Sequence, residues 1–119
     1  GSISGQLIGA GGGSSAYESS KAALIQFTKS IAVDYAQHNI RANIISPGEI
    51  TTKLLQNSNA QLENTNEMKS QRPYYVKNRP IEESGLPEEI GELVKYLISR
   101  KTNFMNGADI IVDGAYTLI

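Results

Sequence analysis

The chain has 119 residues, of which 11 are basic and 12 acidic, for a formal net charge of −1. This length allows one domain, and the balanced charge gives no sign of a nucleic-acid or anionic-membrane partner. Cysteine is absent and His38 is the single histidine, which excludes disulfide frameworks and thiolate or histidine-cluster metal sites. No apolar run reaches the roughly 20 residues of a membrane span, and no signal peptide opens the sequence. We therefore expect a cytoplasmic protein without a resident metal.

The first segment, GSISG, is too short for a full strand, and the glycine-rich stretch QLIGAGGGSS that follows predicts a loop. A phosphate-binding P-loop would end in Lys-Ser or Lys-Thr, and a dinucleotide fingerprint would follow a complete strand. Neither feature is present. The composition therefore favours an ordinary loop over a phosphate site.

A helix is predicted over residues 16–37, because large apolar residues recur there at steps of three and four. These residues are Leu24, Phe27, Ile31 and Tyr35. A second face carries small residues that would let another helix or a ligand come close: Ser19, Ser20, Ala22, Ala23 and Ser30. Asn39 suits the C-terminal cap.

The rest of the sequence alternates between strand and helix patterns. The segment IRANIISPGEI predicts a buried strand that Pro47 and Gly48 end, and ADIIVDGA predicts a second strand. Between them, LPEEIGELVKYLIS predicts a helix with Pro87 in its first turn. The polar stretch over 49–80 is long for a structural connection and favours a lid or binding loop.

Alternating helices and apolar strands predict an α/β protein with a parallel sheet. Two strands and a stub make a small sheet for this class, in which both faces are normally covered. We therefore expect residues 1–119 to be the C-terminal portion of a single larger domain, with further residues before Gly1.

Tyr17 and Lys21 are the first candidates for chemistry. They stand four residues apart in SAYESSKAALIQF, which places both side chains on one face of a helix. A free tyrosine has a pKa of about 10 and is a poor base at neutral pH, but a nearby cation stabilises the phenolate. The pair therefore suits a general acid/base that acts on a hydroxyl or carbonyl group. The same spacing also arises by chance on many helices.

Four segments together resemble the short-chain dehydrogenase/reductase family. YESSK matches its Tyr-x-x-x-Lys signature, and Ser4 stands 13 residues before Tyr17, at the spacing of the family's catalytic serine. IRANIISPGEITT resembles the segment after the family's sixth strand, and the last helix and strand also match in order. The resemblance spans nearly the whole chain and implies the C-terminal part of a Rossmann-like, doubly wound parallel sheet, incomplete in this chain.

The resemblance implies a role for each matching residue. Tyr17 would be the general acid/base, Lys21 would bind the nicotinamide ribose and stabilise the Tyr17 phenolate, and Ser4 would orient the substrate oxygen. Four residues would line the cofactor: Pro47, Gly48, Ile50 and Thr52. The implied activity is hydride transfer between NAD or NADP and an alcohol or ketone.

Some family motifs are absent from the sequence. The glycine-rich cofactor loop, the Asn-Ala-Gly segment and the catalytic asparagine would precede Ser4 in family members. The residues that select NAD or NADP are absent with them, so this chain alone is expected to bind a dinucleotide poorly.

Two other interpretations stay open. A truncated, catalytically inactive chain could act only as a folded assembly module, forming a homodimer or homotetramer through the 16–37 helix. A generic α/β binding domain is a third reading, and it leaves the Ser4 spacing unexplained. The substrate would be a small molecule, and apolar residues in the polar stretch suggest a hydrophobic or ring-bearing alcohol: Leu54, Leu55, Tyr74 and Tyr75.

Overall fold

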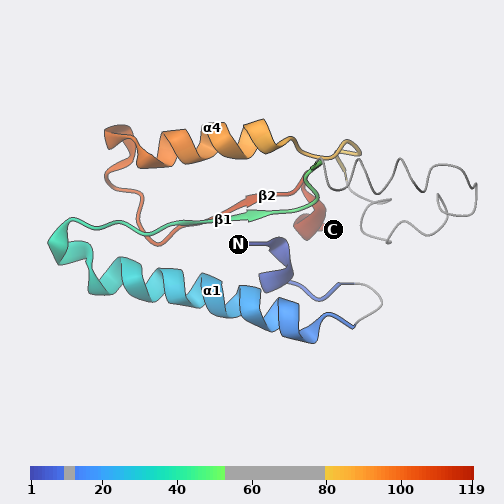
Figure 1. Ribbon diagram of the computed structural model, residues 1–119, viewed down its shortest axis with the longest axis horizontal. Helices are drawn as coiled ribbons and strands as arrows, with labels where there is room; N and C mark the ends of the chain where they lie inside the picture. The colour runs from blue at the N-terminus through green and yellow to red at the C-terminus, as the bar shows by residue number, and fades with distance from the viewer. Residues whose placement is uncertain (10–12, 53–79) are drawn as a thin grey trace, which may run out of the picture.

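The computed structural model describes residues 1–9, 13–52 and 80–119. Its main elements are α1 (Ser15–Asp34), β1 (Ile44–Pro47), α4 (Pro87–Ile98) and β2 (Asp109–Val112). Short 3-10 turns, η1 (Ile3–Gly5), η2 (Ala36–His38), η3 (Arg100–Thr102) and η4 (Tyr116–Leu118), flank them. Figure 1 shows the two strands as a middle layer, with α1 on one side and α4 on the other. None of the helices in these ranges is long and apolar enough to cross a membrane.

The two strands form a parallel pair, as the sequence predicts. Ile44 lies opposite Asp109, and the register continues to Pro47 opposite Val112. The chain before β1 is bonded to the chain before β2 through a backbone group and a side chain: Gly107 donates to the Ala42 carbonyl at 2.7 Å, and the Asn106 side-chain oxygen accepts the Ala42 N–H at 2.9 Å. The strand itself begins at Ile44 and is shorter than the apolar run that predicted it.

The predicted lid covers residues 49–80, and most of it lies outside the described residues. Leu54, Leu55, Tyr74 and Tyr75 all belong to that part. The start of this segment lies beside the chain that follows it. Thr51 donates to the Gly85 carbonyl at 2.8 Å, and Gly85 donates to the Glu49 carbonyl at 3.1 Å.

Helix α1 begins one residue before the predicted start and ends at Asp34, three residues before the predicted end. Asn39 follows the η2 turn with φ 58°, the left-handed conformation typical of a helix cap.

The buried face of α1 differs from its apolar stripe. Ile25 and Ala32 are buried, whereas Leu24, Phe27 and Tyr35 are exposed. Gly107 lies next to this face, since a Cβ on Gly107 would lie 3.4 Å from the Ala32 Cβ. The Asn106 side chain also donates to the Ala32 carbonyl at 2.8 Å, so the chain before β2 covers this part of α1.

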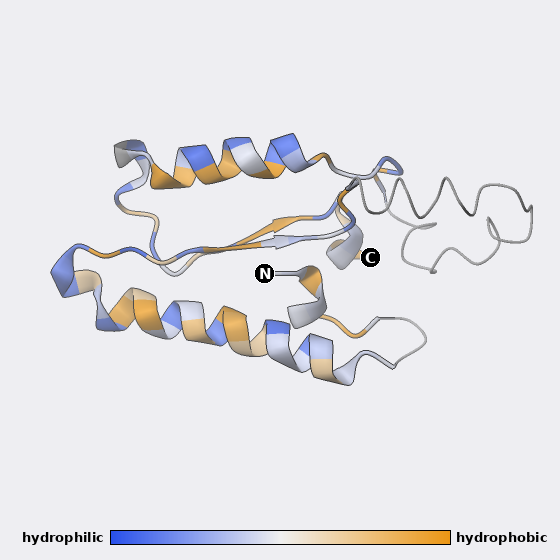
Figure 2. Ribbon diagram, in the orientation of Figure 1, coloured by the Kyte–Doolittle hydropathy of each residue, from blue (hydrophilic) through white to orange (hydrophobic). Residues whose placement is uncertain are grey.

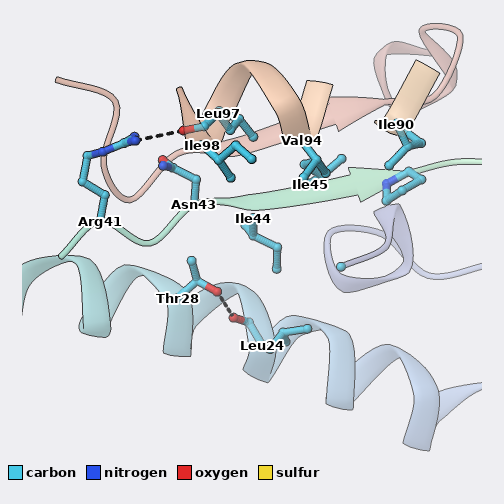
Figure 3. Close-up of a pocket in the computed structure, with 12 residues that line it drawn as sticks. Leu24, Thr28, Arg41, Asn43, Ile44, Ile45, Ile90, Val94, Leu97 and Ile98 are labelled. Atoms are coloured by element: carbon cyan, nitrogen blue, oxygen red, sulfur yellow. Dashed lines mark hydrogen bonds between the residues drawn. The ribbon is translucent and has the colours of Figure 1, made fainter. Parts of the chain in front are cut away.

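Helix α4 follows its prediction closely. Pro87 occupies the first turn, and the Glu89 carboxylate accepts the Leu86 N–H at 2.6 Å, which satisfies one of the free donors at the helix start. Figure 2 shows the apolar side of α4 facing the sheet. Ile90, Val94, Leu97 and Ile98 line a cavity of about 560 Å³ together with residues of α1 and β1 (Figure 3).

Arg41 ties the start of β1 to the end of α4. Its Nη1 donates to the carbonyls of Thr102 at 2.9 Å and Met105 at 3.0 Å, and its Nη2 donates to the Leu97 carbonyl at 2.9 Å (Figure 3). Asn43 adds a hydrogen bond to Met105 at 2.9 Å. One guanidinium thus satisfies carbonyls at a helix end, where intrahelical donors run out.

A second polar network fixes η1 against the sheet. Ser46 is fully buried, and its hydroxyl donates to Asp109 at 2.6 Å. The other carboxylate oxygen of Asp109 accepts from the Gln6 side chain at 2.7 Å. A partly buried carboxylate needs such donors, and here they come from β1 and from the chain just after η1. The network therefore holds the turn that carries Ser4 next to the strands.

Candidate active site

Ser4 and Tyr17 line the same cleft. Its volume is about 490 Å³, and it lies between η1, the start of α1 and the chain that follows β1. Gly48 and Ile50 also line it, and Tyr116 contributes from η4. The structure thus brings together residues from three segments that are far apart in the sequence.

Gly5 allows η1 to approach α1 closely enough to form this cleft. A Cβ placed on Gly5 would lie 2.7 Å from the Lys21 carbonyl carbon and 2.7 Å from Ile25 Cδ1, both closer than van der Waals contact. The neighbouring Ser4 is held by the Ser2 hydroxyl, which accepts the Ser4 N–H at 3.2 Å. Close packing at Gly5 therefore sets the position of Ser4 relative to the first turns of α1.

Replacing Gly5 with alanine is expected to destabilise the protein by about 1–3 kcal/mol, because the added methyl group meets backbone that has to shift. Chemical denaturation measures the free energy of unfolding. Gly91→Ala is the matched control: its Cβ meets no atom within 4 Å, so the helix propensity of alanine should stabilise α4 by about 0.5–1 kcal/mol. Equal effects of the two substitutions would contradict the close packing at Gly5.

Tyr17 and Lys21 form the predicted pair on α1. The Lys21 ammonium lies 5.0 Å from the centroid of the Tyr17 ring, within the range of a cation–π interaction. Lys21 is half-buried, whereas Tyr17 is 51% exposed and opens onto the cleft. The arrangement places a proton-carrying hydroxyl at the cleft with a fixed positive charge beside its ring.

Of the four residues expected to line the cofactor, at the end of β1 and just after it, two line the cleft. Gly48 and Ile50 line the cleft, and a Cβ on Gly48 would lie 2.9 Å from the Asp113 Cβ, so the ends of β1 and β2 approach closely there. Pro47 lines the apolar cavity between α1 and α4 instead. Thr52 is exposed at the last described position before residue 80.

Sequence reasoning did not identify Tyr116, Glu18 or Glu49, which also line the cleft. Tyr116 reaches it because Asp113 organises the turn after β2: its two carboxylate oxygens accept the N–H groups of Ala115 at 2.9 Å and Thr117 at 2.7 Å. An Asp side chain often accepts backbone N–H groups of the turn that follows it, and this tendency was the sequence signal for the turn that carries Tyr116.

The apolar cavity of Figure 3 offers less chemistry than the cleft. Its polar side chains include Arg41 and Asn43, and both are engaged with backbone groups. Asn43 also accepts the Ala108 N–H at 3.0 Å. The cleft at Tyr17 is therefore the candidate active site.

Comparison with known proteins agrees with the motifs at this cleft. A family model described as Enoyl-(Acyl carrier protein) reductase matches residues 2–117. The crystal structure of a short chain dehydrogenase family protein from Francisella tularensis superposes on the whole chain with a TM-score of 0.80 and 35% identity. The chain belongs to the short-chain dehydrogenase/reductase family. Its two-stranded sheet with flanking helices is accordingly part of a Rossmann-like fold.

Two further family members are similar to this chain. Oxidoreductase UcpA of Salmonella typhimurium is 37% identical over 117 residues, which are 98% of this chain and 44% of UcpA. The structure of 4-hydroxyisoleucine dehydrogenase complexed with NADH matches 99% of this chain and 45% of its own, with a TM-score of 0.80 and 35% identity. The Francisella match covers 49% of that protein. The chain thus spans about half the length of the short-chain dehydrogenase/reductase proteins it matches.

Proposed function

We propose that the protein is an NAD(P)-dependent oxidoreductase that transfers hydride between the nicotinamide and an alcohol or ketone. The observation that carries the proposal is the shared cleft of Ser4 and Tyr17, with the Lys21 ammonium over the Tyr17 ring. Family membership supports the reaction class, and the relative solved with NADH supports the type of cofactor.

The cleft fits the nicotinamide end of such a cofactor. The cleft has a volume of about 490 Å³. Gly48 lines it with its backbone, because a side chain at this position would collide with Asp113. We propose that Gly48 and Ile50 contact the nicotinamide, that Lys21 binds its ribose, and that Pro47 and Thr52 lie at the ends of this contact segment. When bound, the cofactor accepts or supplies the hydride.

The side chains of the cleft would manage the proton. In alcohol oxidation, the Tyr17 oxygen takes the proton of the substrate hydroxyl as the carbon-bound hydrogen leaves with its electron pair, and a carbonyl forms. Lys21 stabilises the phenolate form of Tyr17 through its positive charge. The Ser4 hydroxyl donates a hydrogen bond to the substrate oxygen and orients it. Carbonyl reduction runs through the same groups in reverse.

An absorbance assay of reduced nicotinamide tests this proposal on the protein as its gene encodes it. NAD⁺ and NADP⁺ are each offered with a panel of secondary alcohols that includes 4-hydroxyisoleucine, which the name of one relative suggests, and cyclic alcohols, which the sequence suggests. Turnover with one of these alcohols, and its reversal with the matching ketone, supports the proposal. Failure with both cofactors across the panel contradicts it.

We also propose that the protein forms a homo-oligomer through α1. Phe27 and Val33 are apolar residues exposed on this helix by 60% and 78%, and Tyr35, just past its end, is 47% exposed. Sedimentation velocity should detect a dimer or tetramer for the wild type and a smaller species for Phe27→Glu. A wild-type monomer at micromolar concentration would contradict this assembly. The predicted cytoplasmic location stays a prediction for cell fractionation to test.

A further inference from the structure

Glu18 follows Tyr17 in the chain and has no role in the proposed reaction. Glu18 lines the cleft, and its Oε1 accepts a hydrogen bond from the Gly9 N–H at 2.9 Å. Both groups are partly buried. A carboxylate that accepts a backbone N–H makes a charge-assisted hydrogen bond, about twice as strong as a neutral one.

Gly9 belongs to one wall of the cleft. Leu7 and Gly9 both line it, together with Ser4. This wall is attached to η1 at its first residue, where Leu7 donates to the Ile3 carbonyl at 3.2 Å. Ile8 between them is 80% exposed and contributes little packing. Among the residues that the structure describes, the Glu18 carboxylate bonds the far end of the Leu7–Gly9 wall.

The same side chain joins this wall to the proposed proton donor. Glu18 follows Tyr17 directly in the first turns of α1, so its backbone moves with the tyrosine. The bond to Gly9 sets the distance between the Leu7–Gly9 wall and the Tyr17 side of the cleft. A substrate bound against Tyr17 would meet this wall.

We propose that Glu18 is a positioning residue that fixes the Leu7–Gly9 wall and thereby sets substrate affinity in the cleft. The effect on substrate affinity rests on the proposed oxidoreductase function, whereas the role of Glu18 in holding Gly9 does not. Glu18 acts through its acceptor oxygen on the Gly9 amide, and Tyr17, Lys21 and Ser4 keep their roles.

A purely local role for Glu18 is the alternative that the test must separate. An acidic residue in the first turns of α1 also stabilises the helix through its macrodipole. That effect depends on the negative charge, whereas the bond to Gly9 needs an oxygen at the position of Oε1. Glu18→Gln loses the charge and keeps the oxygen, and Glu18→Ala loses both.

The experiment compares these two variants in the protein as its gene encodes it. Hydrogen exchange of the Gly9 amide is measured first, since it requires no substrate or cofactor. Steady-state kinetics follow with 4-hydroxyisoleucine and NAD⁺ as the probes. Glu88→Gln and Glu88→Ala are the matched controls, because Glu88 is an exposed acid in the first turn of α4, away from the cleft.

In Glu18→Ala we expect exchange of the Gly9 amide to rise about tenfold, consistent with loss of one charge-assisted hydrogen bond. The KM for the alcohol should rise by a similar factor, about tenfold, while the KM for NAD⁺ and kcat stay within about threefold. Glu18→Gln should restore amide exchange and alcohol KM to within about threefold of the wild type. Both Glu88 variants should leave these quantities unchanged.

Two results would overturn the proposal. Unchanged exchange at Gly9 in Glu18→Ala would show that the carboxylate does not hold the wall. A Gln variant as impaired as the Ala variant would show that the charge matters and the acceptor position does not. If the protein turns over none of the alcohols offered, the proposed function fails, while amide exchange still decides whether Glu18 holds Gly9.

Discussion

Tyr17→Phe is expected to lower kcat by about 10²–10⁴-fold, the usual contribution of a positioned general acid/base. Phenylalanine keeps the aromatic ring, whose centroid lies 5.0 Å from the Lys21 ammonium. It removes only the hydroxyl that carries the proton. The free energy of unfolding should change little, because Tyr17 is about half exposed. Steady-state turnover with the alcohol found in the nicotinamide assay measures the effect.

Tyr35→Phe is the matched control for this substitution. Tyr35 lies just past the C-terminal end of α1, is exposed to a similar degree, and packs its ring 6.3 Å from the His38 ring. It does not line the cleft, so removal of its hydroxyl should leave kcat unchanged. A Tyr17→Phe enzyme with near wild-type turnover would show that another group transfers the proton.

Arg41→Ala is expected to lower the free energy of unfolding by about 3 kcal/mol, because it removes three charge-assisted hydrogen bonds to carbonyls, each of which keeps one other donor. These carbonyls belong to Leu97, Thr102 and Met105, between the end of α4 and the start of β2. Chemical denaturation measures the change.

Two further variants calibrate the Arg41 effect. Arg41→Lys keeps the charge but lacks the planar fork that reaches several acceptors, so it should recover only part of the lost stability. Lys95→Ala removes an exposed cation whose ion pair with Glu92, at 3.4 Å, should contribute less than about 1 kcal/mol. If Arg41→Ala cost no more than Lys95→Ala, the three-carbonyl clamp would not stabilise the fold.

Local sequence signals predicted the elements that depend on local physics. Helix α4 was located well because its amphipathic period, its Pro87 start and its acidic first turn all act within a few residues. Strand β2 followed from a short apolar run ended by Asp113 and Gly114. The family resemblance, rather than local physics, implied that Ser4 and Tyr17 share a site; both line one cleft, and their roles stay predictions.

Features that depend on long-range packing were not predicted. The buried face of α1 carries Ile25 and Ala32, because these two residues pack against Gly5 and Gly107, which come from other parts of the chain. Arg41 gave no local signal of its partners, which lie about 60 residues away in the chain. The roles of the cleft residues themselves stay predictions.

The central claim is that the nicotinamide and the substrate meet at Tyr17 in the cleft beyond β1. Intermolecular NOEs between bound NAD⁺ and the protein as its gene encodes it test this most directly. We predict NOEs from the nicotinamide protons to Tyr17 and Ile50, which line the cleft. NOEs to Val94 and Leu97 of the apolar cavity, or the absence of NOEs to any cleft residue, would contradict the claim.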